Sequence, residues 1–270
     1  MSLPEAKQIN VFIGHDERLD IDWQICSKSL RWNNKEGSRK PIRIFKMNHR
    51  DLRQIKLFQR AWQVEGDTGN YLDLKDGRPF STQFSHSRFL APSYAKYLGC
   101  NALDPCIFVD SDFIFMSDIW DILVDCKDWR EKPISVVKHS FMPLATEKMD
   151  HQSQVKYPMK LWSSLILFNL LHPSHKPDID KVNAENGSWL HGFGWLKADQ
   201  IGEIPEKWNF IPNHSEERVK TRDVKAIHFT EGSPALLGNK IKYSEIYSFY
   251  KQMVLEENLE RLKEPINGGY

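Results

Sequence analysis

The sequence predicts an α/β fold that begins with a parallel pair of strands, and two observations carry this prediction. First, an apolar run at residues 9–14, a stretch with helical spacing at residues 19–32 and a second apolar run at residues 41–46 follow one another as strand, helix and strand. This order favours a parallel pair joined by a right-handed crossover. Second, residues 107–109 form another continuous apolar run, which is typical of buried parallel strands.

Further elements extend this pattern along the chain. Residues 88–98 have the pattern of a helix that Gly99 ends, and residues 134–137 and 165–170 are apolar enough for strands. Residues 243–262, in which charged and apolar side chains alternate, predict a helical tail.

We expect one domain with two lobes, because the chain shows no internal repeat, low-complexity tract or clear linker. Residues 1–125 contain most of the predicted sheet. The second half, residues 126–240, is rich in Trp, Pro, Gly and His from residue 189 to 234, which suits a loop-rich substrate lobe, and residues 241–270 form the helical tail. Residues 50–76 are mixed in character, and glycines mark turns there.

Composition narrows the classes of function. Lysine and arginine total 37 against 36 acidic residues, so the net charge gives no electrostatic case for a nucleic-acid partner. The four cysteines lack both the density of a disulfide scaffold and the spacing of a zinc site, so we expect reduced, packed thiols. The chain has no signal-peptide pattern and no run of ~20 apolar residues. We therefore expect a soluble cytoplasmic protein, with peripheral membrane contact left open.

An acidic triplet stands between two apolar runs. Asp110 and Asp112 are two residues apart, so in an extended chain both side chains face one site, and the short Ser111 between them leaves room for a ligand. Converging carboxylates resist ionising together unless a cation neutralises them, and oxygen ligands favour magnesium, manganese or calcium. Solvated turn acids are the alternative. The apolar framing by residues 107–109 and 113–115 favours a site.

A histidine far downstream is a candidate third ligand. His228 follows a short apolar pair and precedes a turn at Gly232. Imidazole suits manganese better than calcium. A lone histidine is more often a packed or surface residue, and only its pairing with the acidic triplet favours a metal ligand.

These features together resemble the family 8 glycosyltransferases, which include glycogenin and bacterial lipopolysaccharide galactosyltransferases. The chain looks still closer to a poorly characterised bacterial and phage group of the same kind. The matching phrases keep their order and approximate spacing, and they lie at residues 11–16, 85–89, 110–112, 162–164, 208–209 and 228–232.

The resemblance implies a GT-A fold, in which helices flank a twisted, mostly parallel sheet that carries a loop-rich acceptor lobe. It also implies retaining transfer of a sugar from a nucleoside-diphosphate sugar, UDP-sugar above all, to a hydroxyl of a carbohydrate or lipid-linked acceptor. The cofactor would be Mn²⁺ or Mg²⁺, bridging the diphosphate. Residues 1–125 become the nucleotide-sugar half and residues 126–240 the sugar and acceptor half.

The resemblance also implies the site residues. Asp110 and Asp112 would bind the metal with His228, and the two acids are the leading catalytic candidates. The nucleotide-binding candidates are Phe12, Ile13, Gly14, His15, Asp16, Arg18, Ser87, Arg88, Ser111 and Gly232. For Asp16, an ordinary N-cap after the first strand is the alternative.

The chain departs from the family at three places. Many members have Asn-Ala-Gly at the sugar, where this chain has Trp162, Ser163 and Ser164; with Arg88 these form the predicted sugar site, through the serine hydroxyls. The phosphate-binding lysine after the histidine is missing, and Lys240 is a substitute close downstream. No clean copy of the family Asp-Gln-Asp segment occurs, so the candidates to assist at the sugar are Asp199 and His191, for which packing or loop roles are equally compatible.

Two other functions stay open. A haloacid-dehalogenase-type phosphohydrolase also places Asp-x-Asp after an apolar strand, but this chain lacks the later Gly-Asp-Gly cluster. A catalytically inactive carbohydrate- or nucleotide-binding protein on the same fold would explain the missing lysine.

Overall fold

A computed structural model describes residues 5–34, 41–66, 71–140 and 159–263. Its strands are β1 (Ile9–Gly14), β2 (Ile42–Met47), β3 (Trp62–Val64), β4 (Tyr71–Asp73), β5 (Pro79–Phe80), β6 (Cys106–Val109), β7 (Phe113–Phe115), β8 (Ile134–Val136), β9 (Leu165–Phe168), β10 (Ile201–Glu203) and β11 (Ala226–His228). Its α-helices are α1 (Asp20–Asn33), α2 (His49–Gln54), α3 (Ala91–Tyr97), α4 (Asp121–Asp125), α5 (Ile179–Ala184), α6 (Gly187–His191), α7 (Pro234–Leu237) and α8 (Ser244–Lys263).

The central sheet has the strand order β10-β8-β9-β6-β1-β2. β1 pairs in parallel with β2 and with β6, which confirms the predicted strand, helix and strand at the start of the chain. β9 runs antiparallel to both β6 and β8. The carboxyl ends of β1 and β6 therefore lie at one edge of the sheet, and Leu165, where β9 begins, pairs with Val109 at that same edge. This is the edge at which open α/β sheets bind ligands.

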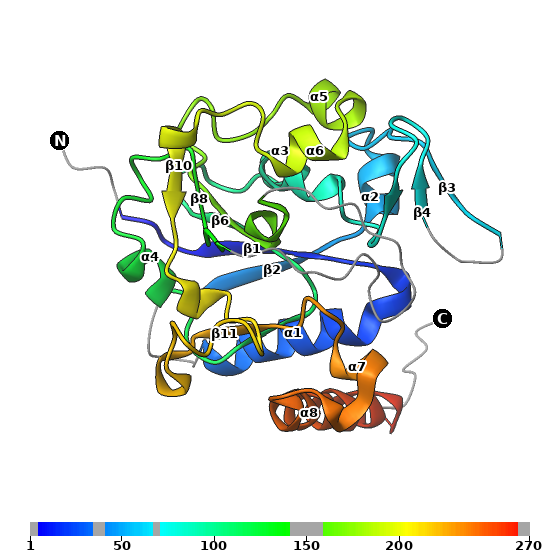
Figure 1. Cartoon of the computed structure of the whole chain (residues 1–270), viewed down its shortest axis with the longest axis vertical. Coiled ribbons are helices and arrows are strands. Elements are labelled where there is room, and N and C mark those ends of the chain that lie inside the picture. The colour runs from blue at the N-terminus through cyan, green and yellow to red at the C-terminus, as the bar shows by residue number, and fades with distance from the viewer. Residues whose placement is uncertain (1–4, 35–40, 67–70, 141–158, 264–270) are drawn as a thin grey trace, which may run out of the picture.

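Helices cover both faces of this sheet (Figure 1). Because side chains alternate along a strand, Val11 and Ile13 of β1 pack in one apolar core with Leu30 of α1, while Phe12 packs in the other with Ala95 of α3. Both faces of β1 and β6 are completely buried, which accounts for the continuous apolar runs in the sequence.

A second, two-stranded sheet lies beside the central one. β7 and β11 pair antiparallel, with Phe113 opposite His228 and Phe115 opposite Ala226. α1 packs against β7, and α8 packs against α1 (Figure 1). The predicted helical tail is thus confirmed as α8, and it helps to support the strand pair that carries the acidic triplet and the histidine.

The sequence did not reveal β10 or the three-stranded sheet β3-β4-β5. These strands are two or three residues long, too short for an alternating pattern to stand out. The small sheet is held by a cluster of Trp62, Tyr71 and Phe80 and by a buried ion pair between Arg60 and Asp73.

Two compositional expectations also have structural outcomes. All four cysteines are free thiols, as predicted, and three of them are buried. Within the ranges that the structure describes, no helix combines the length and the apolar character that a membrane span requires.

Candidate active site

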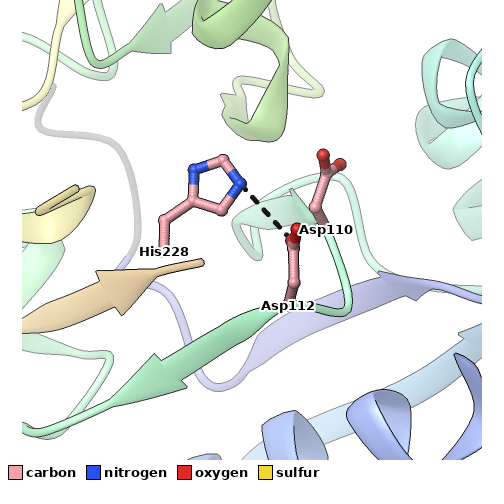
Figure 2. A group of neighbouring side chains, drawn as sticks. All are labelled: Asp110, Asp112 and His228. Carbon is pink, nitrogen blue, oxygen red and sulfur yellow. Dashed lines mark ion pairs between the residues drawn. The ribbon is translucent and has the colours of Figure 1, made fainter. Parts of the chain in front are cut away.

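Three candidate metal ligands converge at the carboxyl edge of the central sheet. Asp110 directly follows β6, Asp112 directly precedes β7, and His228 is the last residue of β11 (Figure 2). One ligand atom from each side chain lies within 4.8 Å of the other two. The pairing of β7 with β11 produces this convergence, because it sets His228 opposite Phe113 and so beside Asp112, with Nε2 3.3 Å from Oδ1. The predicted grouping of these residues is confirmed.

The charges of this centre suit a divalent cation. Each carboxylate side chain is only 15% exposed, and Arg88 supplies one positive charge, with Nη1 2.8 Å from Oδ1 of Asp110. The guanidinium of Arg88 is itself buried, 5.3 Å from the ring centres of Phe84 and Phe108. Two carboxylates against one guanidinium leave a net negative charge, and two oxygens with one imidazole nitrogen are donors that Mn²⁺ accepts.

A residue outside the triplet orients His228. Nδ1 of the imidazole lies 2.9 Å from Oδ1 of Asn209, and the ring stacks on Phe113 at a centroid distance of 4.3 Å. Asn209 is completely buried. Metal-binding histidines commonly hold the second ring nitrogen in this way, which leaves the first as the ligand. The sequence pointed to Asn209 only as part of the matching phrase at residues 208–209.

The two serines of the predicted sugar site turn inward. They end a 3₁₀ helix, η3 (Lys160–Ser164), which leads into β9. The hydroxyl of Ser163 contacts Nδ1 of His191 at 2.7 Å, and the hydroxyl of Ser164 bonds the carbonyl oxygen of Leu161 at 2.7 Å. Both serines are buried. Both hydroxyls thus have partners inside the protein, and their contact with sugar oxygens stays a prediction.

Trp162 is half-buried, and its indole N–H donates to the carbonyl oxygen of His139 at 3.0 Å.

His139 lies deep behind the centre, 3.7 Å from a carboxylate oxygen of Glu206. Burial lowers the pKa of His139 to about 4, so its imidazole is neutral near pH 7. Sequence reasoning missed this residue, because nothing near it in the sequence marks a site.

The two candidates for assisting at the sugar have different surroundings. His191 is buried and reaches the metal centre indirectly, through Ser163 and Arg88. Asp199 is exposed and precedes β10, whose first residue pairs with the first residue of β8. It therefore lies at the amino edge of the sheet, opposite Asp110. The structure does not bring Asp199 to the site.

At the end of β1, the side chains of Phe12 and Ile13 are completely buried in apolar cores, so a nucleotide could reach these two residues only through their backbone groups. Their nucleotide contact stays a prediction. A Cβ on Gly14 would lie 2.6 Å from the ring of Phe84, so glycine is required for that close approach.

The carboxylate of Asp16 is already engaged by protein donors. It is completely buried and accepts hydrogen bonds from the backbone and guanidinium of Arg18, from the backbone N–H of Gln83 and, at 3.4 Å, from Tyr71. Asp16 caps the short helix that follows, which is the N-cap alternative. His15 is also buried, and both its ring nitrogens contact neighbouring side chains. The Asp16 carboxylate, which the prediction assigns to the nucleotide, is thus already hydrogen-bonded within the protein.

The remaining nucleotide candidates divide into two groups. Ser87, at the start of the 3₁₀ helix Ser87–Leu90, and Ser111, the middle residue of the acidic triplet, are both buried. Gly232 and Lys240 line a pocket of about 460 Å³ that also includes His228. Gly232 has φ +130°, and a Cβ there would lie 2.8 Å from a methyl carbon of Leu237. Lys240, proposed from sequence as a substitute lysine, thus shares a pocket with a candidate metal ligand.

No protein-family model matches this chain. Among solved structures it is similar to the galactosyltransferase LgtC in complex with donor and acceptor sugar analogs, with a TM-score of 0.54 and 12% identity over 91% of this chain and 96% of that one. The glycosyltransferase GlyE of Streptococcus pneumoniae TIGR4 gives a TM-score of 0.52 and 15% identity over 97% of this chain and 66% of that one. The likeness shows the fold, which is the GT-A type that the family 8 resemblance implied.

The chain also has a relative in plants. It is 35% identical over 270 residues to protein CDI of Arabidopsis thaliana, and the alignment covers 97% of this chain and 92% of that protein. Identity at this level over nearly the full length of both proteins shows common descent. The chain belongs to the family of protein CDI.

Proposed function

We propose that this protein is a metal-dependent glycosyltransferase that moves a sugar from a nucleoside-diphosphate sugar, UDP-sugar above all, to a hydroxyl of a carbohydrate or lipid-linked acceptor. The convergence of Asp110, Asp112 and His228 at the carboxyl edge of a GT-A sheet carries the proposal. LgtC, which shares the fold, holds donor and acceptor sugar analogs. Retention at the anomeric carbon follows from the family 8 resemblance and belongs to the same proposal.

Each residue of the centre has a chemical task in this proposal. Asp110, Asp112 and His228 would hold Mn²⁺ or Mg²⁺, and a bound cation neutralises the charge that grows on the leaving diphosphate. Arg88 fixes the carboxylate of Asp110 through its ion pair. The surrounding burial strengthens these charge interactions, because little water screens them.

The pocket beside His228 is the proposed place of the diphosphate. Its volume of about 460 Å³ is in the usual range for small-molecule sites. The absence of a side chain at Gly232 lets a ligand approach the backbone closely. Lys240 brings a positive charge to this pocket, where the family lysine is missing. Phosphate oxygens would therefore meet a backbone turn and a lysine beside His228.

A screen of nucleotide-sugars tests the proposal. Melting temperature would be measured with UDP- and GDP-sugars, with and without Mn²⁺, and release of the nucleotide would then be followed with the stabilising donor. We expect a rise in melting temperature that requires both metal and nucleotide, followed by metal-dependent release. Asp110→Ala and Asp112→Ala should remove both effects.

Other outcomes would select the competing functions. Metal-dependent stabilisation by a nucleotide, with no release from any donor or with any acceptor tried, would identify a binding protein that has lost turnover. Hydrolysis of a generic phosphate ester that depends on Asp110 would identify a phosphohydrolase and would contradict the glycosyltransferase proposal.

A further inference from the structure

A directed chain of hydrogen bonds ends at the proposed metal ligand His228. It begins at the carbonyl oxygen of Leu161, which accepts from the hydroxyl of Ser164 at 2.7 Å. The same hydroxyl oxygen accepts from Nδ2 of Asn209 at 2.9 Å. Oδ1 of Asn209 then faces Nδ1 of His228 at 2.9 Å. The side chains of all three polar residues are buried.

The chemistry of each group fixes the direction of this chain. A hydroxyl has one proton, and a carbonyl oxygen can only accept, so Ser164 must give its proton to Leu161. Ser164 can then only accept from Asn209, which forces the amide NH₂ toward the serine and the amide oxygen toward His228. His139 also bonds this amide, but two lone pairs facing each other at 2.9 Å would repel, so Nδ1 of His228 carries the proton. Nε2, the nitrogen that faces Asp112, is left with its lone pair.

We infer that Ser164 is a positioning residue, which sets the tautomer of His228 through Asn209 and so leaves Nε2 able to bind a metal ion. The inference deepens the proposed function, because it rests on His228 being a metal ligand there. It also assigns Ser164 a different role from that of a sugar contact.

Ser163 contacts Arg88, the partner of Asp110, but its hydroxyl has less influence there than the hydroxyl of Ser164 has on His228. Nη1 of Arg88 donates to the backbone carbonyl of Ser163 at 2.9 Å, and its contact with the hydroxyl is longer, at 3.4 Å. Since the backbone oxygen remains in any variant, loss of the Ser163 hydroxyl should disturb Arg88 and Asp110 only slightly. Ser163→Ala is therefore a matched control for Ser164→Ala, at the neighbouring residue.

The test reads the tautomer of His228 directly, in protein without metal. The ¹⁵N shifts of the imidazole would be recorded at about pH 8. We expect the Nδ1–H form in the unmodified protein and a large gain of the Nε2–H form in Ser164→Ala, because the freed amide can turn. Mn²⁺ affinity by calorimetry should fall roughly tenfold in Ser164→Ala and less than about threefold in Ser163→Ala.

Two further variants guard against a general loss of structure. Ser29→Ala removes another buried hydroxyl with the same two kinds of bond, to Cys26 and from Phe115, and should leave the tautomer and Mn²⁺ affinity unchanged. Asn209→Asp presents only acceptor oxygens, so it should hold the Nδ1–H form with or without Ser164 and rescue the tautomer in the double variant.

The outcomes separate this inference from the proposed function. An unchanged tautomer and unchanged Mn²⁺ affinity in Ser164→Ala, with weaker donor binding, would overturn the inference in favour of a sugar contact. If the unmodified protein bound no Mn²⁺ while Ser164→Ala still shifted the tautomer, the proposed metal site would fail and the role of Ser164 in setting the tautomer would stand.

Discussion

The ends of β1 and β6 make an instructive comparison. Both are completely buried strands that lie side by side, and both lead into acidic residues at the same edge of the sheet. Asp16 after β1 is completely buried and accepts hydrogen bonds from three other residues of the protein. Asp110 and Asp112 after β6 keep 15% of their side-chain surface exposed and face each other.

The difference lies in how far the protein itself balances the charge of an acid that follows a buried strand. Around Asp16, Arg18 and the backbone of Gln83 satisfy the carboxylate, so it stabilises the local chain. Around Asp110 and Asp112, the described neighbours leave a net negative charge that a cation can neutralise. Functional sites commonly hold like charges close together at a cost in stability.

The largest expected effect comes from Asp112→Asn, which keeps the shape of the side chain and removes its charge. Metal-dependent turnover should fall about a thousandfold, since a bound cation contributes several kcal/mol to charge stabilisation. The metal-free protein should be as stable as before or more so, because one of two repelling carboxylates is gone. Steady-state kinetics and urea unfolding in EDTA would check both halves; a marked loss of stability would make Asp112 a structural acid like Asp16.

The second effect concerns how the free energy of unfolding depends on pH through His139, which lies behind the candidate metal centre. The pKa of His139 is about 4 in the folded protein, lowered by burial from an ordinary 6.5. Between these values the unfolded chain binds more protons, so stability should fall as pH drops from 6.5 toward 4, by up to about 3 kcal/mol. Urea unfolding in EDTA across this range should show a shallower fall in His139→Gln. Equal slopes in the two proteins would mean that His139 titrates normally.

Much of the fold and the core of the site could be predicted from the sequence. β1, β2 and β6 are visible because strands buried on both faces are apolar throughout. Asp110 and Asp112 stand out because two apolar runs frame them, and His228 stands out because it ends a strand before a glycine turn. Strong local patterns therefore identified the three candidate ligands.

The supporting residues could not be found in this way. Asn209 reaches Ser164 across 45 residues of sequence, and His191 reaches Ser163 across 28. Such contacts depend on how η3 and the strands pack, and a single sequence carries no local signal for them. The same limit explains Ser163 and Ser164, whose hydroxyls could be assigned to a sugar from sequence and turn inward in the fold.

The third effect is a loss of stability at the β1 end. Asp16→Ala should lower the free energy of unfolding by about 2 kcal/mol, because it leaves the donors of Arg18 and Gln83 without their acceptor. The estimate is at the low end for a buried ion pair, since the Arg18 side chain is 33% exposed. Mn²⁺ affinity should stay within about twofold of the unmodified protein by calorimetry. A large drop in Mn²⁺ affinity would show that the two strand ends are coupled.

The smallest effect tests the pocket beside His228. Lys240→Ala should raise the KM for the nucleotide-sugar up to about fivefold and leave Mn²⁺ affinity unchanged, because a partly solvated charge contributes at most ~1 kcal/mol. The difference from the unmodified protein should shrink at high salt, which screens exposed charges.

Lys242→Ala is the matched control for that variant, since Lys242 is also a surface lysine but pairs with Glu216 at 3.1 Å and does not line the pocket. Equal KM changes in the two variants would show a general effect of surface charge. A change in KM confined to Lys240→Ala would place the diphosphate on the His228 side of the metal centre. Donor binding would then depend mainly on the residues after β6, and less on those after β1, where protein donors already satisfy Asp16.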